Sequence, residues 1–236
     1  RAYGMLCETY EICEGDMAID PEAPIGELAL VMPGGAALFE KLGLDFCGTG
    51  KVSLAAACGG AGLPLEDVVA SLEEASRSAA NVAAFRDWRA ERPTAVAHHI
   101  VDHNFPVERE TMADMAQLIA KVASVHGARH PELFEINALW ADLCERLAKL
   151  LREESRALEP FLEEPTAPKS GPSLFTDQHE EVVTLAHRIR VLTHGYAPPA
   201  DACDAFLALY RELAAFEADL HEHVLLADNV LFVDPP

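Results

Sequence analysis

Three polar side chains interrupt apolar stripes in three different long segments of the sequence. His223 and His179 each stand on a stripe of apolar residues spaced three and four apart, and Glu154 lies among leucines on a third stripe. This spacing places residues on one face of a helix. An ionised glutamate in an apolar core is unfavourable unless it is paired, protonated or bound to a metal. Because helix bundles build metal sites from side chains on facing helices, the three residues together predict a metal site.

Two histidines and one carboxylate suit non-haem iron with open coordination positions, and zinc and manganese are alternatives. Taken singly, each residue also has an ordinary structural explanation. A core histidine is commonly hydrogen-bonded to the backbone. Glu154 could pair with Arg190 or lie at the edge of its helix. The hypothesis of a metal site therefore rests on the combination of residues rather than on any one of them.

Four long helices must position these residues. Apolar periodicity predicts them over residues 94–126, 132–162, 174–195 and 200–228, and the breaks between them are short. Strand patterns are nearly absent. We therefore expect an all-α fold whose C-terminal part is an antiparallel four-helix bundle.

The first of these helices has two competing inward faces. One register is His98, Val101, Phe105, Glu108, Met112, Met115, Ile119, Val122 and His126, and the other begins Val96, Ile100, His103 and Val107. Both are about equally apolar, so the inward polar residues of this helix stay open. The histidines outside the candidate site are expected on the surface or around the site: His98, His99, His103, His126, His130, His187, His194 and His221. Of these, His126 and His221 are expected nearest to the candidate ligands.

The region that precedes the bundle has a different sequence pattern. After an acidic arm over residues 1–24, residues 25–80 contain short helical pieces broken by glycine-rich turns. These features predict a small helical domain over 25–80, a linker over 81–93 and the bundle over 94–232.

The charge balance narrows the classes of partner. The 236 residues carry 18 Lys and Arg against 39 Asp and Glu, a formal net charge of −21. Such a surface repels nucleic acid and anionic lipid, so neither is an expected partner. No apolar run is long enough to span a bilayer, and no signal-peptide pattern is present, so we expect a cytoplasmic protein. Six cysteines without regular spacing are expected to be reduced.

Several stretches of the chain resemble a known family. They are IGELALVMPGGAALFEKLGLDFCGTGKVSLAAAC near the N-terminus and HHIVDHN, VHGARHPEL, DQHEEVVTLAHRIRVLT and LHEHVLLADNVLF in the bundle. They are similar to the repair-of-iron-centres (RIC) proteins, which have an N-terminal ScdA-type domain and a hemerythrin-like four-helix bundle that holds two irons. The family is linked to recovery of iron–sulfur clusters after nitrosative and oxidative stress. The resemblance covers roughly residues 25–232.

The resemblance implies a set of ligand positions. The family takes one histidine from each bundle helix and bridging glutamates from the second and fourth helices. Its third-helix histidine falls on His179, its fourth-helix histidine on His223 and its second-helix glutamate on Glu154. The other three positions hold apolar residues: Phe105, Leu150 and Ala227.

These replacements are expected to empty one of the two iron positions. In the family arrangement the histidines of helices one and two serve one iron, and those of helices three and four serve the other. We therefore expect a mononuclear site on His179, His223 and Glu154, with Glu108 as a candidate fourth ligand and the three apolar residues lining the vacated half. The alternatives are a metal-free core and a binuclear site with substitute ligands.

Cys47 is a further candidate functional residue. The family carries a Cys-Cys pair after Leu-Asp-Phe, and here only Cys47 is present, followed by Gly48. The resemblance implies redox or nitric oxide chemistry at this thiol. A single thiol cannot close a vicinal disulfide.

Three functions follow as expectations. The first is a RIC-like non-haem iron protein that handles iron or nitric oxide in stress defence. The second is a mononuclear iron enzyme that activates O2 or NO on a small substrate, and the third is a metal-free regulatory or binding relative. The expected partners are a metal ion, with NO or O2, and either a second copy of the chain or another protein.

Overall fold

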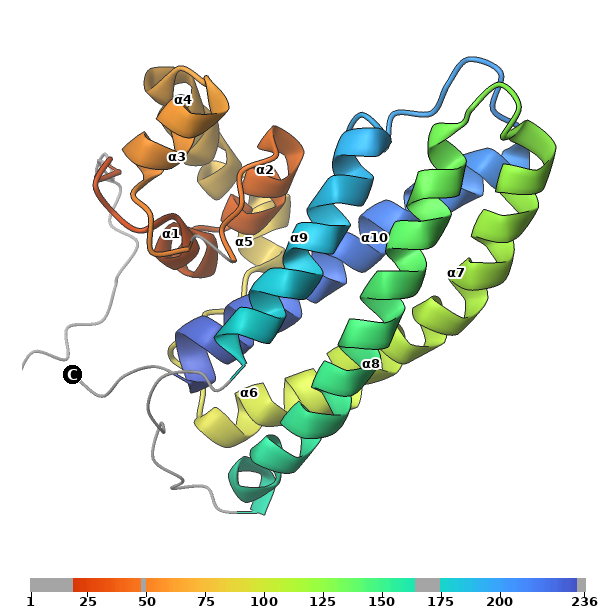
Figure 1. Cartoon of the computed structure of the whole chain (residues 1–236). Coiled ribbons are helices and arrows are strands. Elements are labelled where there is room, and N and C mark those ends of the chain that lie inside the picture. The colour runs from red at the N-terminus through yellow and green to blue at the C-terminus, as the bar shows by residue number, and fades with distance from the viewer. Residues whose placement is uncertain (1–18, 48–49, 164–174, 233–236) are drawn as a thin grey trace, which may run out of the picture.

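The computed structural model describes residues 19–47, 50–163 and 175–232, and most of these residues lie in helices (Figure 1). Extended pairing within these ranges is limited to one isolated bridge between Pro24 and Ser53. The prediction of an all-α fold is therefore confirmed. None of the described helices combines the length and the apolar character that crossing a membrane requires.

Four long helices form the bundle. They are α7 (Phe105–His126), α8 (Glu132–Glu163), α9 (Thr176–Leu192) and α10 (Asp204–Leu226). Helix α7 contacts α8, α8 contacts α9, and α10 contacts both α9 and α7, which closes the bundle. Its core is made of the apolar stripes that the sequence shows, including the fully buried Ile119, Leu143 and Leu209. The predicted four-helix bundle is confirmed, with boundaries shifted by a few residues.

The first bundle helix is interrupted by a π-helical turn. Helix α6 (Pro93–His99) runs into η1 (Ile100–Asn104) and then directly into α7. At this turn the amide of Phe105 donates to the carbonyl oxygen of Ile100, five residues back. Pro106 follows at the next position and has no N–H to donate, which favours a local break in the regular bonding pattern.

This turn explains why the sequence shows two possible inward faces for the first bundle helix. Before it, Val96 and Ile100 are fully buried, and after it, Phe105 and Glu108 are fully buried. The extra residue of a π turn rotates the following helix about its axis, so the inward face passes from one register to the other. Each register is therefore correct on one side of η1, and His103 is exposed.

A second π turn ends the last helix. Element η2 (Ala227–Leu231) continues α10, and the amide of Phe232 donates to the carbonyl oxygen of Ala227. The turn carries Asp228 to the beginning of α9, where it meets His179. Both π turns therefore lie at the end of the bundle that holds the candidate ligands.

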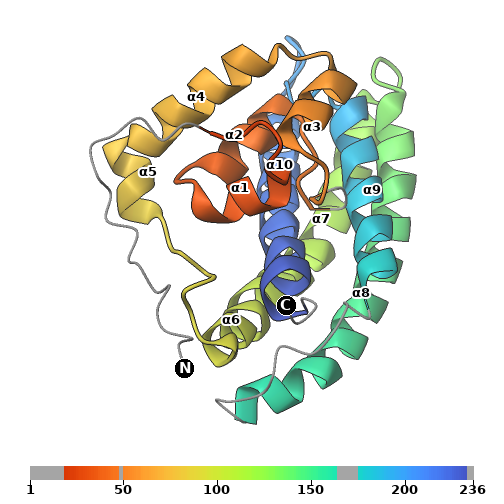
Figure 2. The ribbon, with the colours of Figure 1, turned by 90° about the vertical axis from the view of Figure 1, so that its left-hand side faces the viewer.

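The N-terminal region forms a small helical layer. It comprises α1 (Ile25–Val31), α2 (Gly35–Leu42), α3 (Leu54–Ala61), α4 (Leu65–Arg77) and α5 (Ala79–Ala84). Its buried side chains include Phe39, Phe46, Leu54 and Leu72. Figure 2 shows α1, α2 and α3 in front of α10, with α4 and α5 beside them.

Polar contacts attach this layer to the bundle. Arg190 of α9 donates through Nη1 to the carbonyl oxygen of Glu40 at 2.7 Å and through Nε to Glu217 Oε2 at 2.7 Å. The thiol of Cys47 donates to the carbonyl oxygen of His221 at 3.2 Å. Arg190 thus pairs with Glu217, so the alternative that it pairs with Glu154 is wrong.

Candidate metal centre

Glu154, His179 and His223 converge inside the bundle. They come from the second half of α8, the first turn of α9 and the last turns of α10. One potential ligand atom from each residue lies within 4.8 Å of the others. The three side chains are between 0 and 1% exposed. Three helices therefore bring together the residues that the apolar stripes single out.

The carboxylate of Glu154 lies between the two imidazole rings. Its Oε2 is 2.9 Å from Nε2 of His223 and 3.5 Å from Nε2 of His179. The two rings stand at 80° to one another, with centroids 5.6 Å apart. Both Nε2 atoms therefore face the same small volume.

A second carboxylate holds each ring from its other side. Glu108 Oε1 is 2.9 Å from Nδ1 of His223, and Asp228 Oδ1 is 2.9 Å from Nδ1 of His179. A carboxylate on the remote nitrogen fixes the tautomer and the direction of a metal-binding histidine. The structure thus places Glu108 behind His223, outside the group of three. Asp228 has no signal in the sequence, because its position depends on the π turn of η2.

The site leaves buried polar atoms without hydrogen bonds. Within the described residues, Glu154 Oε1, His179 Nε2 and Glu108 Oε2 are buried and make none. Such atoms are unfavourable in a core and call for a partner. A cation among Glu154, His179 and His223 would satisfy the first two, so the residues present fit a metal ion.

The neighbouring side chains set the ionisation of the Glu154 carboxyl. Burial on its own raises the pKa of the Glu154 carboxyl, but the positive charges of His223 and His179 beside it outweigh this and lower the pKa to about 2. Burial lowers the pKa of His223, but Glu108 and Glu154 outweigh it, and the pKa lies well above its usual value. Glu154 is therefore ionised although it is fully buried.

Apolar side chains border this cluster. Phe105 and Ala227 are fully buried, and Leu150 is 1% exposed. The Phe105 ring meets His223 edge-on, with centroids 5.1 Å apart. Leu150 lies one turn before Glu154, and Ala227 lies one turn after His223. Their expected role as the apolar lining of the site stays a prediction.

Cys47 lies away from solvent at the contact between the N-terminal layer and α10. It is 6% exposed. Burial, together with the nearby charges of Asp45 and Glu40, raises the pKa of the Cys47 thiol well above its usual value. The thiolate is the reactive form of cysteine, so this location disfavours the chemistry that the resemblance implies for Cys47.

The expected position of His126 is wrong. Its Nε2 lies 3.2 Å from Cys203 Sγ, and its ring packs against Phe206 at the start of α10. Phe206 and His223 are separated by about 25 Å of helix. His126 therefore lies at the opposite end of the bundle. His221 is near His223 in sequence but packs against Phe46 of the N-terminal layer.

Comparisons with known proteins agree with this arrangement. Residues 21–76 match ScdA_N, a domain of unknown function, and residues 108–233 match the hemerythrin HHE cation-binding domain. The iron-sulfur cluster repair protein YtfE of Pectobacterium carotovorum subsp. carotovorum is 31% identical over 215 residues, covering 88% of this chain and 94% of the relative. The chain belongs to the hemerythrin-domain family of iron–sulfur cluster repair proteins. The YtfE protein of Escherichia coli O17:K52:H18 is 29% identical over 213 residues, covering 89% of this chain and 95% of the relative.

Membership of this repair family confirms the resemblance to the RIC proteins. The hemerythrin match begins at Glu108 and includes Glu154, His179 and His223. The cation-binding domain of the family is thus the part of the chain in which the buried cluster lies.

Proposed function

We propose that this chain is a non-haem iron protein of iron-centre repair that binds one iron through Glu154, His179 and His223. The observation that carries the proposal is the convergence of these three side chains within 4.8 Å in a buried bundle core. The relatives are named iron-sulfur cluster repair proteins, and we propose the same process for this chain.

The surrounding residues orient the proposed ligands. Glu108 and Asp228 hold the two histidines so that each Nε2 faces Glu154. The buried position of all three side chains excludes bulk water and strengthens their attraction for a cation. Iron bound by two histidines and one carboxylate would offer open coordination positions to NO or O2.

The proposal of one iron rests on the apolar residues. Phe105, Leu150 and Ala227 fill the core beside the cluster and offer no donor atoms. The repair-family resemblance assigns the positions of Phe105 and Leu150 to histidines of the other iron, and the position of Ala227 to a glutamate that bridges both irons. On this proposal, the remaining iron position keeps both of its histidines and one bridging glutamate, while the other position has lost both of its histidines.

Metal analysis of protein purified without oxygen tests this function. After gel filtration with a mild chelator, we expect near one iron per chain in the wild type and none in His179→Ala. His187→Ala is a matched control, because His187 is exposed on the same helix. Near two irons per chain would contradict the mononuclear site, and absence of stoichiometric metal after reconstitution would support the metal-free alternative.

The second candidate is an enzyme that activates O2 or NO on a small apolar substrate. The observation in its favour is the apolar side of the cluster, where the ring of Phe105 meets His223. Binding of NO to the ferrous protein is expected for both candidates. O2 uptake that depends on an added substrate would select the enzyme.

A further inference from the structure

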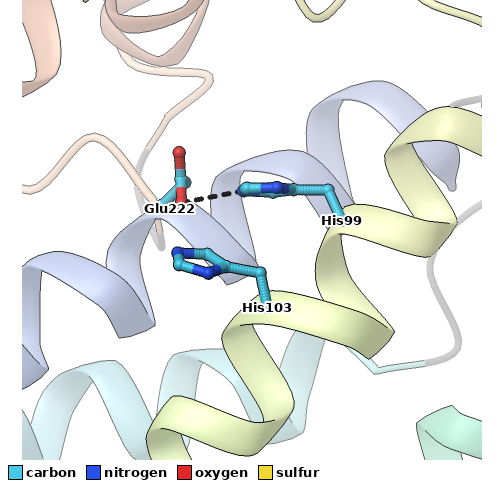
Figure 3. A group of neighbouring side chains, drawn as sticks. All are labelled: His99, His103 and Glu222. Atoms are coloured by element: carbon cyan, nitrogen blue, oxygen red, sulfur yellow. Dashed lines mark hydrogen bonds and ion pairs between the residues drawn. The ribbon is translucent and has the colours of Figure 1, made fainter.

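A second group of potential metal ligands lies outside the buried site. His99 ends α6, His103 lies in η1, and Glu222 projects from α10 (Figure 3). One potential ligand atom from each lies within 4.8 Å of the others. Nε2 of His99 is 3.2 Å from Oε2 of Glu222. We propose that His99, His103 and Glu222 form an exchangeable site for a divalent transition-metal ion.

The helix geometry brings the two histidines together. Residues four apart in a helix lie on the same face, one above the other. The His99 and His103 rings are stacked, with centroids 4.9 Å apart and planes at 29°. Figure 3 shows both rings beside Glu222, which comes from the neighbouring helix. The π turn of η1 allows this pair to face outward while Phe105 and Glu108 face the core.

A buried amide positions the carboxylate. Asn104 is fully buried, and its Nδ2 donates to Oε2 of Glu222 and to Oδ1 of Asp219, each at 3.2 Å. Glu222 is thus an oriented acceptor, held by His99 and Asn104 as a metal-binding carboxylate usually is by its neighbours.

The donor set favours a particular class of metal. An ordinary ion pair needs only His99 and Glu222, and His103 adds a second imidazole to the same position. Two imidazole nitrogens and one carboxylate oxygen suit zinc or ferrous iron better than magnesium or calcium. The cluster is therefore better matched to a transition metal than to a simple salt bridge.

The surroundings of the cluster favour exchange. The side chains of His99 and Glu222 are 20% and 39% exposed, whereas the buried ligands are nearly inaccessible. His99 and Glu222 also line a cavity of about 480 Å³ between the bundle and the N-terminal layer. An ion held there would keep open positions toward solvent and the cavity, so we expect it to enter and leave more readily than the buried iron.

A tryptophan provides a local probe. The Trp88 ring contacts His99, with centroids 4.3 Å apart. The chain has one other tryptophan, Trp140, which is buried against Phe216. Its indole N–H makes no hydrogen bond within the described residues, so Trp140→Phe removes its fluorescence without breaking one. Cobalt(II) bound at the cluster should then quench Trp88.

The experiment is a cobalt(II) titration of the metal-stripped full chain carrying Trp140→Phe. We expect saturable quenching of Trp88 fluorescence with one cobalt ion bound per cluster. When His103→Ala is added, the cobalt(II) concentration that gives half of the maximal quenching should rise at least tenfold. His98→Ala is the matched control, since His98 is exposed on the same helix and pairs with Asp102. Equal midpoints with and without His103→Ala, or no saturable quenching, would overturn the proposal.

A further variant separates this site from the buried one. In the His179→Ala background, which is expected to lose the buried iron, the Trp88 titration should be unchanged. Loss of quenching in that background would mean that Trp88 reports the buried site, and the second site would be rejected. Iron stoichiometry in His103→Ala is independently expected to stay near one per chain.

Discussion

Glu108 and Glu154 contact opposite nitrogens of the same histidine. Oε1 of Glu108 is 2.9 Å from Nδ1 of His223, and Oε2 of Glu154 is 2.9 Å from Nε2. One carboxylate therefore faces the centre of the cluster, and the other holds the ring from behind. In the proposed site, Glu154 is therefore the residue that binds the metal ion, and Glu108 is the residue that positions the His223 ring. Both are fully buried glutamates.

Glu108→Gln tests this distinction. Glutamine keeps the shape of the side chain but removes the charge that orients His223. Changes at such supporting residues typically weaken metal binding about 10–100-fold, so we expect weaker binding with iron stoichiometry retained at saturation. Competition with a coloured chelator measures the affinity. Glu110→Gln, at an exposed position of the same helix, should leave it unchanged. Complete loss of iron in Glu108→Gln would instead make Glu108 a ligand.

Restoring the replaced ligands tests the vacated half of the site. The triple variant Phe105→His, Leu150→His and Ala227→Glu supplies the donor types that the repair family uses there. If apolar packing alone prevents a second iron, the variant should bind close to two irons per chain, as measured by elemental analysis. The matched triple variant with Phe105→Leu, Leu150→Met and Ala227→Ser should stay at one. A single iron in both variants would contradict the idea of a vacated ligand half.

The ion pair between α9 and α10 should matter for stability. Glu217 is 1% exposed and pairs with Arg190, which also donates to the backbone of Glu40. Arg190→Met leaves a buried carboxylate unpaired, a change that typically costs about 3–5 kcal/mol. Urea unfolding should show this decrease. Arg188→Met removes an exposed pair with Glu135 and should change stability little. Equal stability of the two variants would show that the Arg190 pair is not important.

The thiol of Cys47 should react slowly in the folded protein. Its raised pKa and its buried position both reduce the amount of accessible thiolate. Mass-spectrometric mapping after brief treatment with an alkylating reagent at pH 8 should find Cys203, which is exposed, modified well before Cys47. In urea the two should react at similar rates. Rapid modification of Cys47 in the folded chain would restore it as a candidate reactive thiol.

The sequence predicts the bundle and the central cluster for the same reason. Long apolar stripes dominate the second half of the chain, and a polar residue on such a stripe must face the core. Glu154, His179 and His223 satisfy this pattern within unbroken helices, so periodicity predicts that each faces the core, and the structure adds that they lie at one level of the bundle. Their binding of a metal stays a prediction.

The features that the sequence does not predict lie at the two π turns. A period of 3.6 residues cannot describe a helix with an inserted residue, so the sequence leaves both the face of His103 and the role of Glu108 open. For the same reason the sequence does not predict the position of Asp228, which lies in the π turn η2 and contacts His179. The pairing of His99 with Glu222 joins elements more than a hundred residues apart and has no local signal.

Diffraction at the iron absorption edge tests the central claim most directly. Crystals of anaerobically purified protein should show an anomalous peak contacted by Glu154, His179 and His223, with Glu108 and Asp228 behind the two rings. No second peak is expected beside Phe105 and Leu150. A pair of peaks in the bundle core, or a core without any peak after iron reconstitution, would contradict a single iron held by these three residues.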